Sequence, residues 1–384
     1  MVNYILTEKR QPRLAPRLYT GVGSLDALSQ IADAFGDGSV WLVTDPGLHG
    51  HGYPDRAQKL LENAGFKVIL VSDVQENPDS LVVRKLGDRL SSDNPSLIVA
   101  LGGGSALDTA KAANLLAFSG GEMVDYRGYG KAKGKLLPMV GIPTTTGTGS
   151  ESQSYAVIEE RQSHLKMACG DPQLLFHTVI LDPELAASQP RRVAAVSGLD
   201  AITHSLESHV TTRKSPLSHM YSMEAWRLLV AAFPKMLQEK PDLETVAEMQ
   251  WGAFLAGAAI EQSMLGACHA SANPLTAHYG LVHGLAVSLM MPGVLRFNSG
   301  GADGPYGSLA RIAGLPGIRP AEELAGMLEK LASSAGLETR LRDCGVNEGI
   351  FPILAEEAFD QWTGKFNPRP VSESDFVEIY KSVF

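Results

Sequence analysis

The chain has 384 residues, of which 44% are hydrophobic and 20% are charged, so it can bury a large core and its length suits two domains. Its formal net charge of −9 argues against a nucleic-acid-binding surface, which normally carries a basic balance. No uninterrupted apolar run reaches the roughly 18 residues of a membrane helix.

The amino-terminal sequence and the cysteines indicate the cellular compartment in which the protein works. The first residues, MVNYILTEKRQPR, carry charges where a signal peptide needs a continuous apolar stretch. Three cysteines, Cys169, Cys268 and Cys344, are an odd number without paired spacing, which is typical of reduced thiols. We therefore expect a cytoplasmic protein.

The first 180 or so residues alternate short, β-branched-rich apolar runs with longer segments of helical spacing. The apolar runs predict buried parallel strands at residues 40–44, 68–71, 97–101 and 136–144. Helices are expected at 55–65, ending with a C-cap at Gly65, and at 79–92. Strand and helix alternating at this pitch indicate a doubly wound parallel sheet.

Two glycine-rich loops leave the carboxyl ends of predicted strands. LIVALGGGSALDTAK (97–111) runs from a strand through three glycines into a helix, where unpaired N–H groups favour an anion such as a pyrophosphate. The loop fits neither the GxGxxG nor the GxxxxGK[ST] pattern, and it could be purely structural. TTTGTGSE (144–151) follows the fourth strand, and two such loops can flank one ligand crevice.

Asp45 closes the first predicted strand. A carboxylate there can accept hydrogen bonds from both hydroxyls of an adenosine ribose and would repel a 2′-phosphate, although Asp45 could also simply form a turn before Pro46. Together with the two glycine-rich loops, Asp45 favours NAD over NADP.

From about Asp182 the pattern changes to long, Ala- and Leu-rich helical segments without convincing strands. Helices are expected at residues 193–210, 216–237, 242–265, 321–336 and 350–362. The fold prediction is an α/β domain over residues 1–182 and an all-α domain over residues 183–384.

Asp200 and His204 lie four apart in SGLDAITHSLESH (197–209), which puts both side chains on one helix face, where they can share a metal ion. The alternative without a metal is a hydrogen bond between these two side chains at the protein surface. His209 is five residues beyond His204, so we expect it to point elsewhere.

His269 and His283 lie fourteen apart, and Pro274 and Gly280 between them argue for two helices that meet at a bend. Such a bend would bring two imidazoles towards one point. With the earlier Asp/His pair they would form a set of one carboxylate and three imidazoles, which suits Fe(II) or Zn(II) better than Mg²⁺ or Ca²⁺.

Two neighbours of these histidines are expected to have other roles. His278 fits a core histidine or one that supports a metal ligand from behind. Cys268 lies on a different helix face from His269 and fits a buried, inert thiol.

The ordered motifs resemble one family, the iron-containing (group III) alcohol dehydrogenases, which includes lactaldehyde reductase and 1,3-propanediol dehydrogenase. The motifs cover most of the chain and are jointly specific. They are VTD (43–45), ENP (76–78), GGGSALDTAK (102–111), IPTTTGTGSE (142–151), LDPEL (181–185), SGLDAITHSLE (197–207) and VHGLAVSLMMPGVLRFN (282–298).

The resemblance implies a Rossmann-like dinucleotide-binding domain, a helical domain of dehydroquinate synthase-like architecture and an active site between them. It places the metal ligands at Asp200, His204, His269 and His283. Around the cofactor it places Asp45, Asn77, Gly102, Gly103, Gly104, Ser105, Asp108, Thr144, Thr145, Thr148 and Lys166. It also suggests a homodimer or larger homo-oligomer.

Three positions depart from the family pattern. Asn273 stands where the family commonly has a second histidine four residues after the third ligand. The last ligand lies in VHG (282–284) in place of PHG, and SQSY (152–155) follows GTGSE in place of a segment beginning VT. These positions lie on the substrate side, so the resemblance does not transfer a particular substrate.

The resulting functional hypothesis is reversible hydride transfer between a small primary alcohol or diol and NAD, with the metal acting as a Lewis acid. The enzymatic alternatives are an NAD- and metal-dependent lyase similar to dehydroquinate synthase and a metal-free enzyme similar to maleylacetate reductase. A catalytically silent NAD-binding scaffold is the alternative from another class.

Overall fold

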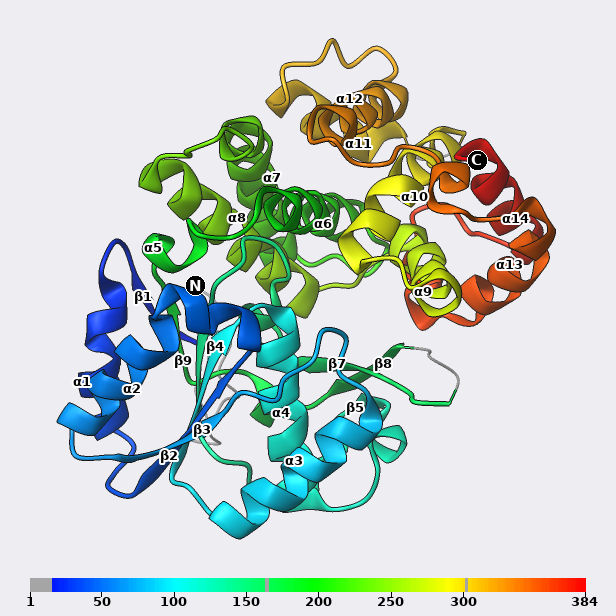
Figure 1. Ribbon diagram of the computed structural model, residues 1–384. Coiled ribbons are helices and arrows are strands. Elements are labelled where there is room, and N and C mark those ends of the chain that lie inside the picture. The colour runs from blue at the N-terminus through cyan, green and yellow to red at the C-terminus, as the bar shows by residue number, and fades with distance from the viewer. Residues whose placement is uncertain (1–15, 163–165, 301–302) are drawn as a thin grey trace, which may run out of the picture.

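The computed structural model describes residues 16–162, 166–300 and 303–384 (Figure 1). The amino-terminal stretch that argues against a signal peptide lies outside these residues. A parallel sheet and its helices form one half of the described chain, up to Leu181, and helices form the other half, from Pro183 onwards. We call them the sheet half and the helical half.

The main sheet of the described residues has six parallel strands in the order β1-β9-β6-β4-β2-β3. Their bounds are β1 Arg17–Thr20, β2 Ser39–Thr44, β3 Lys67–Val71, β4 Leu97–Gly102, β6 Met139–Pro143 and β9 Thr178–Leu181. The four predicted strands correspond to β2, β3, β4 and β6, which confirms the predicted parallel sheet. The edge pair β1 and β9 was not predicted, because four-residue strands give little periodic signal.

Alternate residues of the sheet face different helices. Leu97, Val99 and Leu101 of β4 pack with the helices α1 (Leu28–Asp33) and α2 (Tyr53–Asn63). Ile98 and Ala100 pack on the other face, where α3 (Ser80–Asp93) and α4 (Gly104–Ser119) lie (Figure 1). A strand that is buried on both faces needs a continuous apolar run, which explains the pattern LIVAL.

The predicted helix ends agree with the structure within a few residues. The helix predicted at 55–65 is α2, and Gly65 follows its C-cap with a positive φ of 90°, as expected. A second, three-stranded sheet of β5 (Gly128–Tyr129), β8 (Lys166–Gly170) and β7 (Tyr155–Glu159) was not predicted.

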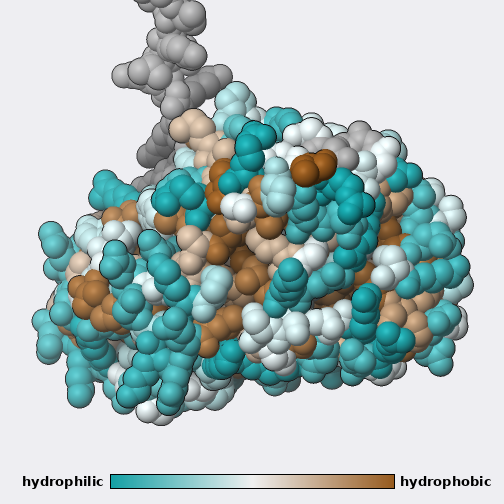
Figure 2. All heavy atoms as spheres, turned by 90° about the horizontal axis from the view of Figure 1, so that it is seen from above, coloured by the Kyte–Doolittle hydropathy of each residue, from teal (hydrophilic) through white to brown (hydrophobic). Residues whose placement is uncertain are grey.

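The helical half is built on α6, α7 and α8, with the later helices beside them (Figure 1). Its helices are α5 Pro183–Ala186, α6 Arg191–Val210, α7 Pro216–Met236, α8 Leu243–Glu261, α9 Ala267–Tyr279, α10 His283–Ser299, α11 Asp303–Ile312, α12 Pro320–Ser334, α13 Phe351–Asp360 and α14 Glu373–Ser382. On the face seen from above, polar residues predominate and apolar residues show between them (Figure 2). None of the helices in the described ranges is long and apolar enough to cross a membrane.

The segment after β6 fastens the sheet half to the helical half. The Ser152 hydroxyl donates to the carbonyl of Phe254 in α8 at 2.8 Å, and the Ser154 hydroxyl donates to Glu261 at 2.7 Å. Gly149 and Gly257 touch so closely that a Cβ on Gly149 would lie 2.9 Å from the Gly257 Cα. The two halves therefore meet through backbone contacts that leave no room for side chains.

A buried lysine holds the same segment from the other side. The Lys111 ammonium donates to the carbonyls of Ser150, Gln153 and Tyr155 at 2.6, 2.7 and 2.8 Å. Asp108, 3.9 Å away, supplies the nearest negative charge. Lys111 is fully buried, so these bonds replace its hydration shell.

We expect Lys111→Met to lower the free energy of unfolding by about 3 kcal/mol, because it leaves buried carbonyls and Asp108 without their cation. Denaturant titration would measure the loss. Lys85→Met is the matched control, since Lys85 is an exposed lysine in α3, and it should change stability by less than about 0.5 kcal/mol. Equal, small effects of the two substitutions would contradict this role of Lys111.

Candidate metal and dinucleotide site

The first pair of predicted ligands lies on α6, a helix buried from Ala194 to Val210. Asp200 and His204 are one turn apart on it, and His204 Nε2 lies 3.4 Å from Asp200 Oδ1. Both side chains are buried, so the alternative of a surface hydrogen bond is wrong.

The second pair comes from the two helices that follow. α9 carries His269 in its first turn and ends at Gly280, whose φ is 63°, and α10 begins at His283. The predicted bend is therefore present, and it lies at Gly280. Pro274 is accommodated inside α9 and does not break it.

The bend brings the two pairs together. Oδ1 of Asp200 lies 3.5 Å from Nε2 of His269, and the rings of His204 and His269 stack with centroids 4.8 Å apart. Asp200, His269 and His283 each offer one ligand atom, and these three atoms lie within 4.8 Å of one another. Asp200, His269 and His283 thus gather at one point, and His204 lies beside it against Asp200 and His269.

The protonation states of Asp200, His204 and His283 suit metal binding. Burial lowers the pKa of His204 to about 4 and, with the nearby Lys166 ammonium, holds the pKa of His283 well below its ordinary value. Burial would raise the pKa of Asp200, but the surrounding imidazoles, His204 first, hold it below its usual range. At neutral pH the cluster therefore offers a carboxylate and at least two neutral imidazoles, the forms that bind metals.

The residues fit a divalent transition metal. Among the described residues, the buried atoms Asp200 Oδ1, His269 Nε2 and His283 Nδ1 have no hydrogen-bond partner, although burial normally demands one. A borderline ion such as Fe(II) or Zn(II) satisfies a carboxylate and imidazoles at once, whereas Mg²⁺ and Ca²⁺ require mostly oxygen ligands.

Glu207 is the residue of this cluster to which the sequence had assigned no role. It lies seven residues after Asp200 on the same buried helix, and its Oε2 lies 2.5 Å from His269 Nδ1. Burial opposes a charge on His269, but Glu207 and Asp200 together raise its pKa to about 9. The spacing i, i+4, i+7 from Asp200 was the available signal.

The other residues of the two motifs lie away from the cluster. His209 contacts the hydroxyls of Ser222 and Ser308, as its spacing predicted. Cys268 is a buried thiol whose pKa burial raises, also as expected. His278 is neither a core histidine nor a support for a ligand: it is half-exposed and pairs with Glu357 at 2.9 Å.

Asn273, which stands where the family commonly has histidine, lies on α9 one turn after His269. Its side-chain amide donates to Gln361 Oε1 at 3.2 Å. The position is half-buried. An amide thus occupies this position and is tied to the segment after α13.

The two glycine-rich loops lie against each other at the carboxyl end of the sheet. The Thr144 N–H donates to the Gly102 carbonyl at 3.0 Å. A Cβ on Gly103 would meet Thr145 at 3.3 Å, and one on Gly104 would meet Thr148 at 2.8 Å. α4 begins at Gly104 and no side chain caps its first turn, in which the N–H groups of Ala106 and Leu107 donate to the Gly103 carbonyl.

Asp45 lies beside the first of these loops. A Cβ on Gly102 would come within 2.9 Å of Asp45 Oδ2, so the glycine permits this approach. Burial raises the pKa of Asp45, although the N–H groups of Gly47 and Leu48 oppose the shift. Gly47 and Leu48 belong to the turn at Pro46–His51, so the Asp45 carboxylate also supports that turn, the alternative role that its place before Pro46 had left open.

Asn77 and Lys166 connect the loops with the metal cluster. The Lys166 ammonium donates to Asn77 Oδ1 at 3.2 Å, and the Asn77 N–H donates to the Ser105 hydroxyl at 3.4 Å. Burial lowers the pKa of Lys166, while Asp200 and Asp108 oppose that shift. Asp108 itself is buried under the loop and accepts from the Val157 N–H at 3.0 Å.

The comparisons with known proteins cover both halves of the chain. The family described as iron-containing alcohol dehydrogenase matches residues 15–183, and the C-terminal part of the Fe-containing alcohol dehydrogenase family matches residues 194–384.

Individual relatives match over nearly their whole length. The chain is 29% identical to an NAD-dependent methanol dehydrogenase of Bacillus methanolicus, over 96% of this chain and 98% of that one. It is 31% identical to alcohol dehydrogenase 4 of Schizosaccharomyces pombe, over 94% and 86%. The crystal structure of a 1,3-propanediol oxidoreductase superposes with a TM-score of 0.92 at 28% identity, covering 96% and 98%.

Glu151, in the second loop, generates a pH-dependent prediction. Burial raises its pKa from an ordinary 4.5 to about 7, so its ionisation destabilises the fold increasingly as the pH rises from about 4.5 to about 7. We expect Glu151→Gln to be more stable than the parent chain by about 2 kcal/mol at pH 8 and by much less at pH 5.

Denaturant unfolding at both pH values measures this difference. Glu356→Gln, at an exposed position of α13, is the control and should show no such dependence on pH. A stability difference for Glu151→Gln that is the same at pH 5 and pH 8 would contradict the burial argument.

Proposed function

Because the chain belongs to the iron-containing alcohol dehydrogenase family, we propose that it transfers hydride reversibly between a small primary alcohol or diol and NAD. The observation that carries the proposal is the convergence of Asp200, His204, His269 and His283 beside two glycine-rich loops. These four residues would hold the metal, and the loops would hold the cofactor.

A divalent metal bound there supplies Lewis-acid chemistry, which lowers the pKa of an alcohol hydroxyl and polarises an aldehyde carbonyl in the reverse direction. The chain's part is geometric and electrostatic. Its helices would fix the four ligand side chains, of which Asp200, His204 and His269 are buried. Lys166 lies close enough to His283 and Asp200 to interact with them electrostatically. Its ammonium would place a positive charge beside the metal ligands.

NAD supplies the hydride acceptor, and the residues around it supply its orientation. The glycines at 102–104 let a pyrophosphate approach the backbone, where the first turn of α4 offers N–H groups and a positive helix end. Asp45 would accept hydrogen bonds from the adenosine ribose. Thr144, Thr145, Thr148, Asn77 and Lys166 would line the path from the pyrophosphate to the nicotinamide.

The family and the named relatives favour an alcohol dehydrogenase over both enzymatic alternatives. A lyase of the dehydroquinate synthase kind would regenerate NAD within each cycle and release no NADH. A metal-free reductase would have no use for Asp200, His269 and His283 gathered at one point with His204 beside them.

Several finer points belong to the same proposal. Residues 1–182 would form the dinucleotide-binding domain and residues 183–384 the metal-binding and substrate domain. The native metal would be Fe(II), with Zn(II) as a substitute. The protein would work in the cytoplasm, which suits its three free cysteines, and it would form a homodimer or larger homo-oligomer.

The central test combines metal analysis with an assay of NADH production on a panel of short alcohols and diols. We expect His269→Ala and His283→Ala to lose the metal and about a thousandfold in turnover, because Lewis-acid stabilisation contributes several kcal/mol. His278→Ala should keep both, since its side chain pairs with Glu357 away from the cluster. Retention of metal and full turnover by the first two variants would refute the ligand set.

The role of Asp45 is tested by cofactor preference. We expect Asp45→Ser to shift the ratio of kcat/KM for NAD over NADP towards NADP by at least about tenfold, because the carboxylate no longer repels a 2′-phosphate. Asp37→Ser, in an exposed loop of the same half, should leave the ratio unchanged. A parent chain that prefers NADP would show that Asp45 does not select the cofactor.

A further inference from the structure

The Glu207 carboxylate bonds to two groups at the start of α9. Its Oε2 lies 2.5 Å from His269 Nδ1, and its Oε1 accepts the Cys268 N–H at 2.8 Å. Both carboxylate oxygens are thereby used, and the residue is 2% exposed. One side chain of α6 thus fixes both the backbone and the imidazole that α9 contributes to the cluster.

The bond to Cys268 anchors the helix itself. The first N–H groups of a helix have no partner inside it, and a carboxylate there also meets the positive end of the helix dipole. Gly266, which precedes α9, makes this approach possible, because a Cβ on it would lie 2.9 Å from Glu207 Oε1. A larger residue at 266 would push the carboxylate away from the helix.

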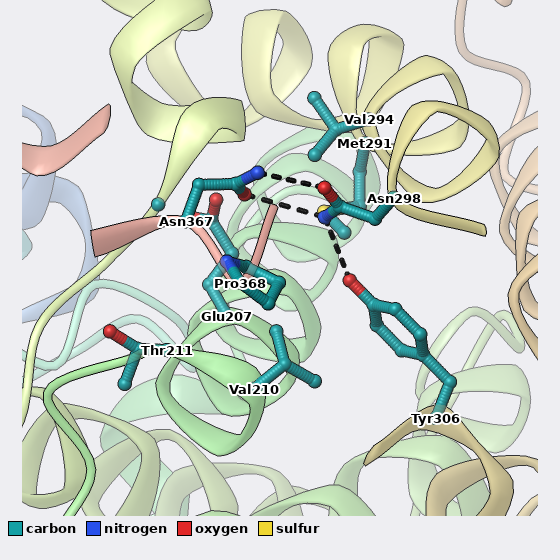
Figure 3. Close-up of a pocket in the computed structure, with 10 residues that line it drawn as sticks. Glu207, Val210, Thr211, Met291, Val294, Asn298, Tyr306, Asn367 and Pro368 are labelled. Carbon is teal, nitrogen blue, oxygen red and sulfur yellow. Dashed lines mark hydrogen bonds between the residues drawn. The ribbon is translucent and has the colours of Figure 1, made fainter. Parts of the chain in front are cut away.

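Glu207 forms an ion pair with His269. In the part of the chain that the structure describes, no lysine or arginine forms an ion pair with it. Glu207 lies on the wall of a pocket in which Asn298 hydrogen-bonds to both Asn367 and Tyr306 (Figure 3). Among the described residues, His269 is the histidine that hydrogen-bonds directly to Glu207.

The contact between Glu207 and His269 Nδ1 determines which nitrogen of the imidazole ring faces the other ligands. A carboxylate at Nδ1 requires the proton on that nitrogen, which leaves Nε2 to the cluster. Nε2 of His269 is the atom that lies 3.5 Å from Asp200 Oδ1 and that has no hydrogen-bond partner among the described residues.

We propose that Glu207 is a positioning residue of the metal site: it holds the His269 ring with Nδ1–H towards its own carboxylate and Nε2 towards the metal. The proposal rests on the ligand set given under the proposed function. Carboxylates that accept a hydrogen bond from a metal-binding histidine fix the tautomer and raise the basicity of the ligand nitrogen.

The test measures metal release. The holoenzyme is loaded with Zn²⁺ and titrated with a chelator, and the protein loaded with Co²⁺ gives a ligand-field spectrum. Glu207→Gln should weaken Zn²⁺ binding by about 10- to 100-fold and alter the Co²⁺ spectrum. Wild-type affinity together with an unchanged Co²⁺ spectrum would overturn the proposal, whatever the melting temperature of the variant.

Two further variants make the result specific. Glu357→Gln removes a carboxylate that also pairs with a histidine, the half-exposed His278 away from the cluster, and should leave zinc affinity unchanged. His269→Ala shows whether a negative result concerns the positioning role of Glu207 or the ligand set itself. If it loses zinc while Glu207→Gln keeps it, Glu207 has no positioning role, and if His269→Ala also keeps zinc, the ligand set itself is wrong.

The unsubstituted protein offers an independent measurement, which stands even if Glu207→Gln does not fold. Histidine labelled with ¹⁵N in the zinc-loaded holoenzyme reports which ring nitrogen carries the proton. We expect His269 to be protonated at Nδ1 and bound to zinc through Nε2. Zinc bound at Nδ1 would overturn the proposal.

Discussion

The burial of α6 is the constraint on which the rest of the structure depends. A helix surrounded by protein along most of its length must satisfy every polar side chain it carries, yet α6 carries Asp200, His204 and Glu207 along one stripe. α9 and α10 bring two imidazoles opposite them, and the proposed metal ion would satisfy the buried atoms that have no hydrogen-bond partner among the described residues. The turn at Gly280 is as necessary as the ligands, since a continuous helix would carry His269 and His283 away from each other.

The cofactor loops depend on the same helices. Gly147 passes so close to α6 that a Cβ there would lie 2.1 Å from the Ser197 carbonyl oxygen, and Gly149 makes a similar contact with α8. Lys166, from the small sheet, reaches Asn77 on one side and is near Asp200 on the other. Hydride transfer requires the donor and the acceptor to be held within about 0.5 Å of their productive geometry. Direct backbone contact between the two halves would keep them in that position.

Much of this arrangement was predictable from residue patterns. Continuous apolar runs such as LIVAL identify strands buried on both faces, and Asp200 and His204 at i, i+4 identify a shared helix face. The short edge strands, the small second sheet and the environment of His278 were not predictable, because they depend on which distant segments meet. Glu207 was within reach of helical spacing, but its partner His269 lies 62 residues away, and nothing local shows that α9 would begin there. The resemblance to a family identified His269 and His283 as a pair where spacing alone left them open.

The glycine contacts between the halves also bear on protein engineering. Relatives of this fold invite recombination, in which the cofactor-binding part of one enzyme is joined to the helical part of another. The chain crosses from sheet to helices near residue 182, but the physical seam lies elsewhere, where Gly147 and Gly149 press against the backbones of α6 and α8. A chimera cut at residue 182 would combine a loop from one parent with the helix surfaces of the other. If the second parent had alanine at position 257, the added methyl group would lie 2.5 Å from the Gly149 carbonyl oxygen. The clash would displace the loop from α8.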